Sequence, residues 1–93
     1  MTTFVNTMKF FIMTDNVMKR NKNDEVKFSS VAINRDSQIC YINSTRKMKN
    51  LEKSKYVTVT ALYMKSFQNG LFITLTDTSK VCEFIFIVQL YLT

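Results

Sequence analysis

Residues 56–87 read YVTVTALYMKSFQNGLFITLTDTSKVCEFIFI. The stretch contains three runs rich in β-branched and aromatic residues, and short polar segments separate them. Runs of this kind are typical of β-strands, and the polar segments between them are typical of turns. We therefore expect a hairpin and then a third strand from Val81 to Val88, with residues 76–80 as the second turn.

The turn of this hairpin is expected at Asn69-Gly70, because both residues tolerate the positive φ that a type I′ turn requires. A two-residue turn there places Phe67 opposite Phe72. Side chains alternate between the two faces of a strand, so the turn also predicts which residues lie together. The predicted core face holds Leu62, Met64, Leu71, Ile73 and Leu75, and the predicted opposite face holds Tyr63, Lys65, Phe67, Phe72 and Thr74.

The second face of the hairpin combines aromatic rings with a lysine and hydroxyl groups. Proteins hold single-stranded nucleic acid with this chemistry, because bases stack on rings for roughly 1–3 kcal/mol each and lysines neutralise phosphates. The alternative is structural. Aromatic cross-strand pairs also stabilise sheets, and a second layer could cover them.

The positive charge is concentrated in one part of the chain. The 93 residues, which we take as one small domain, carry a net charge of +6. Residues 1–55 contain eleven Lys/Arg against five Asp/Glu, whereas residues 56–93 contain two of each sign. A basic surface attracts polyanions, either nucleic acid or an anionic membrane. The many Lys and Asn residues fit an AT-rich coding sequence equally well.

The N-terminal half predicts further β-structure. Residues 8–14 are expected to form a strand, and residues 17–25 a solvated loop or a short helix followed by a loop. Residues 26–43 read as a second hairpin around Asn34-Arg35-Asp36-Ser37, with an irregularity in the first strand that could be a bulge. Tyr41 is its candidate binding aromatic, although it could equally be a half-buried strand residue.

Residues 44–55 predict a short helix that Ser44 or Thr45 could cap. Met48 and Leu51 would form its narrow apolar edge. The cations of this segment would point outward, either as a binding patch or as an ordinary solvated face: Arg46, Lys47, Lys49, Lys53 and Lys55.

Residues 51–86 resemble strands one to three of an OB-fold nucleic-acid-binding domain, in which the second strand often ends in Leu-x-Asp before a turn with Ser or Gly. Leu75, Asp77 and Ser79 stand in those positions. The same residues are similar to short insect and insect-virus-type proteins with a Tyr-initiated strand, but the chain lacks the Leu-Pro ending of those proteins. The resemblance implies a partly open five-stranded barrel. Residues 8–14 and 26–43 could supply the missing strands in another order, the chain could be a truncated or diverged member, or the likeness could be that of any β-meander.

Several classes of function are disfavoured. The chain has no His, its seven carboxylates have no recognisable catalytic spacing, and it has no Gly-rich phosphate loop. We therefore expect no catalysis, no cofactor and no metal. Cys40 and Cys82 are expected as buried free thiols, with a disulfide as the alternative. No secretory signal or membrane-spanning run is evident, so we expect an intracellular protein, nuclear or cytoplasmic.

The sequence thus predicts a mainly β or α+β protein, either a small antiparallel sheet or a partly open OB-like barrel, with one short helix. The hypothesis is a non-catalytic module that binds nucleic acid, preferably single-stranded, with Lys19 and Arg20 as further phosphate contacts. The alternative is a protein-interaction module of viral or effector type that uses a sheet edge or dimerises through Phe84, Phe86 and Leu90. The candidate nucleic-acid-binding residues are Arg46, Lys47, Lys49, Lys65, Tyr63, Phe67, Phe72 and Tyr41.

Overall fold

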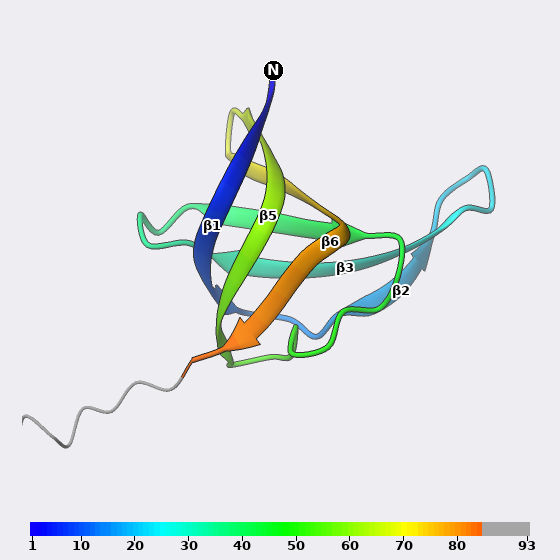
Figure 1. The fold of residues 1–93 in the computed structure, drawn as a ribbon. Helices are drawn as coiled ribbons and strands as arrows, with labels where there is room; N and C mark the ends of the chain where they lie inside the picture. The colour runs from blue at the N-terminus through cyan, green and yellow to red at the C-terminus, as the bar shows by residue number, and fades with distance from the viewer. Residues whose placement is uncertain (85–93) are drawn as a thin grey trace, which may run out of the picture.

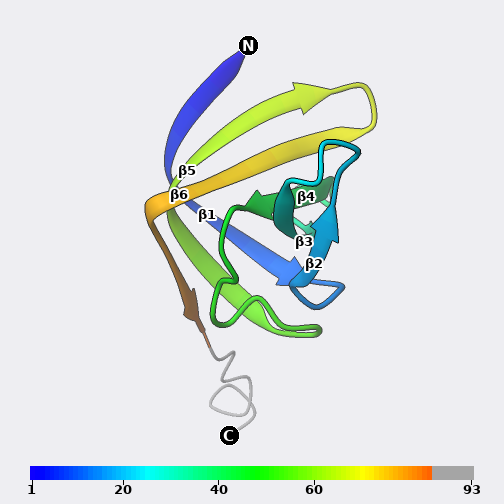
Figure 2. The ribbon, with the colours of Figure 1, turned by 90° about the vertical axis from the view of Figure 1, so that its right-hand side faces the viewer.

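The computed structural model describes residues 1–84 and shows a small closed β-barrel of five strands, with a sixth strand at its margin (Figures 1 and 2). The order around the barrel is β1-β5-β6-β4-β3, and β3 returns to β1. All pairs are antiparallel except β4 and β6, which are parallel. The expected mainly β, OB-like barrel is confirmed. The strands are β1 (Thr2–Ile12), β2 (Val17–Arg20), β3 (Val26–Ile33), β4 (Ile39–Ser44), β5 (Tyr56–Phe67) and β6 (Gly70–Glu83).

The barrel interior is filled by alternate side chains from the five barrel strands. On β5 the alternation changes phase at Ala61, which has a φ of 60° and lies in a bulge between Thr60 and Leu62. A bulge adds one residue to a strand and so moves the following side chains to the other face. Val57 and Val59 before the bulge and Leu62 after it therefore all face the core.

The hairpin of β5 and β6 confirms both predicted faces, although its turn lies one residue earlier than predicted. Phe67 is the register partner of Gly70, so Gln68 and Asn69 make the turn, and Gly70 does not have a positive φ. The predicted type I′ turn is therefore wrong. The register shift is two residues, and a shift of two leaves every side chain on its predicted face. Gly70 is required for another reason, because a Cβ there would collide with the carbonyl oxygen of Ile39.

Residues 76–79 do not form the predicted second turn, and the predicted separate third strand is wrong. They form a corner within β6, after which the strand continues along β5 (Figures 1 and 2). The backbone N–H of Thr76 donates to Ser79 Oγ at 2.8 Å, and the Ser79 hydroxyl donates to the Ala61 carbonyl. The corner is thus bonded to the bulge of β5. Residues 84–88 of the predicted third strand follow the end of β6, and 85–88 lie outside the described residues.

The predicted helix in residues 44–55 is wrong, because none of these residues is helical. Asn50 and Ser54 have φ values of 77° and 71°, which interrupt a right-handed helix. Met48 and Leu51 are nevertheless buried and close one end of the core. The segment, which we call the basic loop (residues 45–55), is held in place by side chains of the connection between β1 and β2.

Two hydrogen bonds from side chains contribute to this attachment, beside a backbone bond from the Asn16 N–H to the Leu51 carbonyl at 3.0 Å. Asn16 Oδ1 accepts from the Met48 N–H at 2.9 Å, and Asp15 Oδ1 accepts from the Lys53 N–H at 2.8 Å. These acceptors satisfy backbone donors that a helix would have bonded internally. Long-range contacts therefore override the local helical pattern.

The N-terminal strands are longer than predicted. β1 begins at Thr2 rather than residue 8, and residues 17–20 form β2 in place of a loop or helix. β1 and β2 follow one another along the same edge of β3. The second hairpin, β3 and β4, is confirmed, and its register is regular without a bulge.

Both cysteines are free thiols, so the alternative of a disulfide is wrong. Cys40 is buried as predicted, and burial raises the pKa of its thiol to about 11. Cys82 is exposed, against the prediction, because it alternates with the inward-facing Val81 on β6.

Candidate nucleic-acid interface

The outer surface of β2, β3, β4, β6 and β5 brings together residues that are distant in sequence. The strand registers place Lys19 beside Lys27, Tyr41 beside Phe72, and Phe72 beside Lys65. Since partners in register point to the same side of a sheet, these side chains share one face. We call it the lysine–aromatic face, and it consists of Lys19, Lys27, Tyr41, Tyr63, Lys65, Phe67 and Phe72.

Three rings of this face form one contiguous group, whereas Tyr63 contacts Phe4, with ring centroids 5.4 Å apart. Phe67 and Phe72 stack with their centroids 4.3 Å apart, and Tyr41 lies 5.9 Å from each of them. Phe72 and Tyr41 remain 43% and 39% exposed, and Tyr63, two residues before Lys65, is 40% exposed. Phe67 is half-buried beneath its neighbours. The rings are therefore not sealed under a second layer, and aromatic faces remain available for stacking.

Two shallow hollows run along the face, on either side of Asn43 and Phe72, which line both. The first has a volume of about 360 Å³ and includes Lys27, Lys65 and Tyr63 among its walls. The second, of about 380 Å³, includes Lys19 and Tyr41. Residues of β2, β3, β4, β5 and β6 line the two hollows between them.

No carboxylate lines either hollow. Within residues 1–84, none of Lys19, Lys27 and Lys65 lies within 4.0 Å of a carboxylate oxygen. Lys19 and Lys27 are direct cross-strand partners, and like charges in this position repel each other. The face thus presents cations that have no described carboxylate within ion-pair distance.

Lys27 is a residue of this face that the sequence reasoning missed. The signal was available, because Lys27 and Ser29 alternate with Phe28 and Ser30 in the strand before the turn of the second hairpin. In the structure Ser29 is the register partner of Asn43, which lies two residues from Tyr41 on the same side of β4. Lys27 and Tyr41 therefore lie on the same face of the sheet. Lys27 was not among the predicted site residues, although Tyr41 was.

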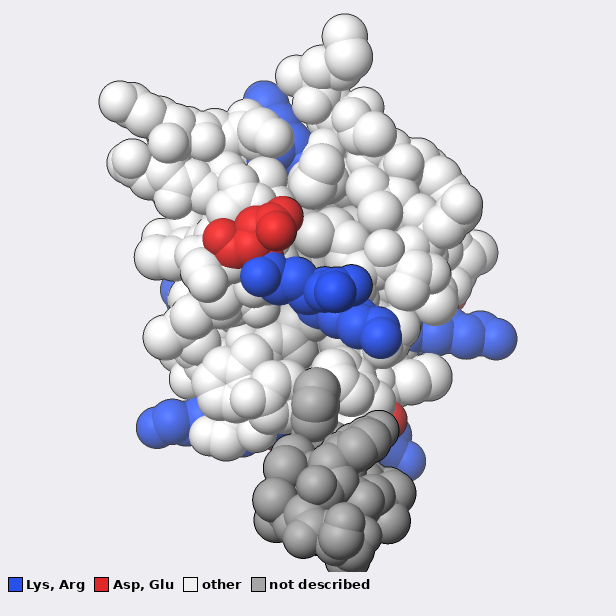
Figure 3. Space-filling model, turned by 90° about the vertical axis from the view of Figure 1, so that its left-hand side faces the viewer, with Lys and Arg blue, Asp and Glu red and all other residues white. Residues whose placement is uncertain are grey.

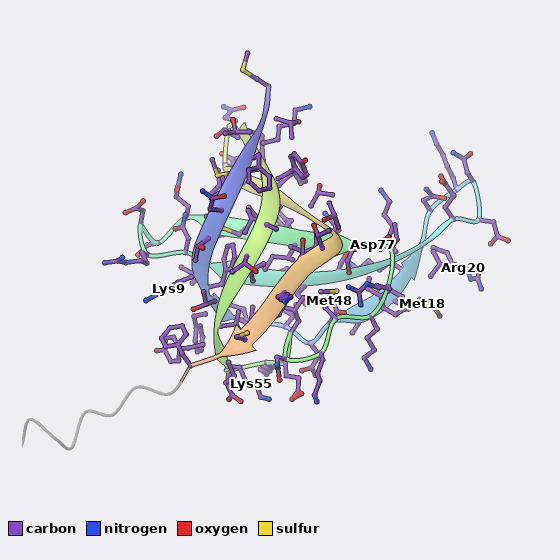
Figure 4. All side chains as sticks on the ribbon, in the orientation of Figure 1. Lys9, Met18, Arg20, Met48, Lys55 and Asp77 are labelled. Carbon is purple, nitrogen blue, oxygen red and sulfur yellow. The ribbon has the colours of Figure 1, made fainter. Side chains whose placement is uncertain are left out.

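Arg46 lies apart from the rings, at the corner of β6. Its guanidinium donates to the Asp77 carbonyl from Nη2 at 3.3 Å, and its Nε lies 3.9 Å from Asp77 Oδ1. Figure 4 labels Asp77 at this corner. Arg46 is therefore engaged with a carboxylate, although its neighbour Thr45 lines the first hollow.

Lys47 and Lys49 line a separate hollow of about 590 Å³ at the basic loop, together with Asp15 and Glu52. It shares only Val17 with the two hollows of the lysine–aromatic face. The structure therefore does not bring these two predicted phosphate contacts to the aromatic rings. Arg20, at the tip of β2, pairs with Asp24 at 3.2 Å (Figure 4).

Lys55 bonds within the protein. Its Nζ lies 3.0 Å from Glu52 Oε1 and 3.5 Å from Glu83 Oε1. The hydrogen bond to Glu52 is the main cause of a raised Lys55 pKa, and the charges of Glu52 and Glu83 add to it. The ammonium group is thus held in its charged form by two carboxylates of the fold.

Two of the three residues proposed for dimerisation, Phe86 and Leu90, lie outside the described residues. Phe84 directly follows β6, and its ring lies 5.7 Å from that of Tyr56. In the described part of the chain, no three side chains of Cys, Asp or Glu gather where they could hold a metal ion. Over the same residues, no helix has the length and apolar character to cross a membrane.

No protein-family model matches the chain, and no curated protein is significantly similar to it.

Proposed function

We propose that the protein is a non-catalytic module that binds single-stranded nucleic acid on the lysine–aromatic face. The observation that carries the proposal is the contiguous, partly exposed group of Tyr41, Phe67 and Phe72 beside lysines that no described carboxylate pairs with. Rings offer planar surfaces to bases of any sequence, and lysines neutralise the phosphates between them.

The position of this face within the barrel also supports the proposal. In OB-folds, ligands bind on the face of the second and third strands and on the loops between strands one and two and between strands four and five. Counted along the chain with β2 left out, the second and third barrel strands are β3 and β4, the first loop contains β2, and the second loop is the turn between β5 and β6. Lys27, Tyr41 and Lys19 come from the first three of these places, and Phe67 is the last residue of β5, directly before the turn. This support is an analogy of fold.

The strand spacing gives a footprint. Three strand-to-strand steps, or roughly 14 Å at about 4.8 Å per step, separate β3 from β5, and Lys27 is offset by four residues along β3 from Val31, the register partner of Tyr41. Tyr41 and Phe72 stand on the two strands between them. We propose that two bases stack on these rings while the flanking phosphates contact the lysines.

The test is fluorescence anisotropy with labelled oligonucleotides of about 12 bases, a length within the site sizes of OB-folds. We expect micromolar or tighter binding to single-stranded DNA or RNA and weaker binding to the matching duplex. Three phosphate contacts predict a slope of about −2 when log K is plotted against log[salt]. Absence of binding at low salt refutes the proposal. If heparin displaces the labelled oligonucleotide as well as unlabelled oligonucleotide does, the protein binds polyanions in general and the proposed stacking of bases is refuted.

A second candidate function is pairing with another protein through β2. It is the last strand in the sheet order, all four of its residues are exposed, and Val17 and Met18 are 47% and 57% exposed. A free strand edge can accept a partner strand. Sedimentation at tens of micromolar tests self-pairing, and a monomer contradicts it. Either function is proposed for an intracellular protein.

A further inference from the structure

An apolar hollow lies at the C-terminal end of β1 and shares no lining residue with the two hollows of the lysine–aromatic face. It forms where β1 passes from β5 to β3, because Phe11 is the register partner of both Tyr56 and Ile33. Its volume is about 460 Å³, which is within the range of small-molecule sites.

The walls of this hollow are aromatic and aliphatic. The Phe11 and Tyr56 rings have their centroids 4.9 Å apart, and the Phe84 ring lies 5.7 Å from that of Tyr56. Ile33, at the end of β3, completes the apolar surface. These walls suit the planar, apolar body of a small ligand.

Two cations border the apolar walls. Lys9 Nζ lies 5.3 Å from the Phe84 ring centroid, and Arg35 comes from the turn between β3 and β4. Within residues 1–84 neither cation is within 4.0 Å of a carboxylate oxygen. Asp36 lines an adjacent hollow that Lys9 and Arg35 also line, but it does not line this one. Figure 3 shows this side of the barrel, the side of Lys9 in Figure 4, as mostly uncharged surface with several basic groups and, near its centre, an acidic group beside basic ones.

We infer that this hollow, the Lys9–Tyr56 pocket, binds a small amphipathic carboxylate, with its apolar body on the rings and its anionic head at Lys9 and Arg35. The charge complementarity selects an anion, and the mainly apolar walls select a ligand whose body is not charged. The inference does not depend on the proposed nucleic-acid function, because the two surfaces have no residue in common.

The test uses naphthalene-2-carboxylate and its neutral carboxamide, which have the same ring and nearly the same shape. Amide NMR of the full chain should show shifts at residues 9–11, 33–35 and 56 with both probes. The carboxylate should bind more tightly, by roughly two- to fivefold for each cation, the range of exposed ion pairs. The double variant Lys9→Gln/Arg35→Gln should remove that preference and leave carboxamide binding unchanged.

The matched control is Lys22→Gln/Lys53→Gln, which removes two exposed lysines elsewhere and should keep the preference. The inference is overturned if neither probe shifts these amides, if carboxylate and carboxamide bind equally, or if the preference survives in the double variant. Oligonucleotide binding by the double variant should equal that of the wild type. Its loss would overturn the assignment of the two surfaces to separate ligands.

Discussion

The basic loop and the lysine–aromatic face both carry cations, but they differ in the acidic groups that lie near those cations. In the loop, Arg46 bonds to Asp77, and Lys55 bonds to Glu52 and Glu83. On the face, three lysines stand beside exposed rings, and no described carboxylate is within ion-pair distance of them. Lys47, Lys49 and Lys53 of the loop likewise have no described carboxylate oxygen within 4.0 Å, but Asp15 and Glu52 line the hollow of Lys47 and Lys49, whereas no carboxylate lines the two hollows of the face. A count of Lys and Arg along the chain therefore does not locate the proposed binding surface.

The largest expected effect concerns the structural role of the basic loop. Leu51 is 1% exposed and closes one end of the core. Leu51→Ala should lower the free energy of unfolding by about 2–5 kcal/mol, because it removes buried methyl groups and leaves a cavity. Urea denaturation measures the change. The control Lys53→Ala, at an exposed position of the same loop, should stay within about 0.5 kcal/mol, and an equal effect of both substitutions would contradict the structural role of Leu51.

Loss of a ring from the lysine–aromatic face should weaken oligonucleotide binding more than loss of two cations from the basic loop. Phe72→Ala should weaken oligonucleotide binding by roughly 10- to 100-fold, which corresponds to the loss of one stacked base. Lys47→Gln/Lys49→Gln should change affinity by less than about threefold, because these lysines lie in another hollow. Anisotropy titrations measure both, and thermal melting confirms that Phe72→Ala is folded. The opposite ranking would move the interface to the basic loop.

Both regions show which parts of the molecule local sequence could predict. The faces of the main hairpin could be predicted from alternation alone, and the two-residue shift in register did not disturb them. The position of its turn could not be predicted in this way, since the glycine at position 70 is needed because a Cβ there would collide with the carbonyl oxygen of Ile39 on a neighbouring strand. That contact depends on the parallel pairing of β4 and β6, which no local pattern indicates.

The predictions for the basic loop and for β2 were wrong for related reasons. The spacing of Met48 and Leu51 correctly identified two buried residues, yet the loop is not helical, because Asp15 and Asn16 bond its backbone from more than thirty residues away. β2 has four exposed residues and no alternation, so only its pairing with β3 makes it a strand. Lys19 of β2 lies on the lysine–aromatic face only because β2 pairs with β3.

The third prediction uses the repulsion between Lys19 and Lys27. Lys27→Gln should make the salt slope of binding shallower by about 0.7, the value for one phosphate contact on a single strand. The same substitution should raise the free energy of unfolding of the unbound protein by about 0.2–1 kcal/mol, because it removes a like-charge cross-strand pair. Salt-dependent anisotropy and urea denaturation measure the two effects. A decrease in oligonucleotide affinity together with an increase in stability is expected only if Lys27 contacts the ligand. A decrease in both would indicate that Lys27 has a structural role.

The smallest expected effect concerns Lys55, whose charge the fold itself uses. Its pKa is raised, first by the hydrogen bond to Glu52 and then by Glu83, so the folded protein binds this proton more tightly than the unfolded chain. The contribution to stability is therefore complete below the unfolded pKa of Lys, about 10.4, and is lost as pH rises through the higher folded pKa. Lys55→Gln should lower the urea midpoint slightly near neutral pH and have no effect above the folded pKa. Oligonucleotide affinity should not change, which would contrast this internally paired cation with Lys27. A difference in midpoint that stays constant across this pH range would show that the loss comes from packing of the side chain and not from its charge.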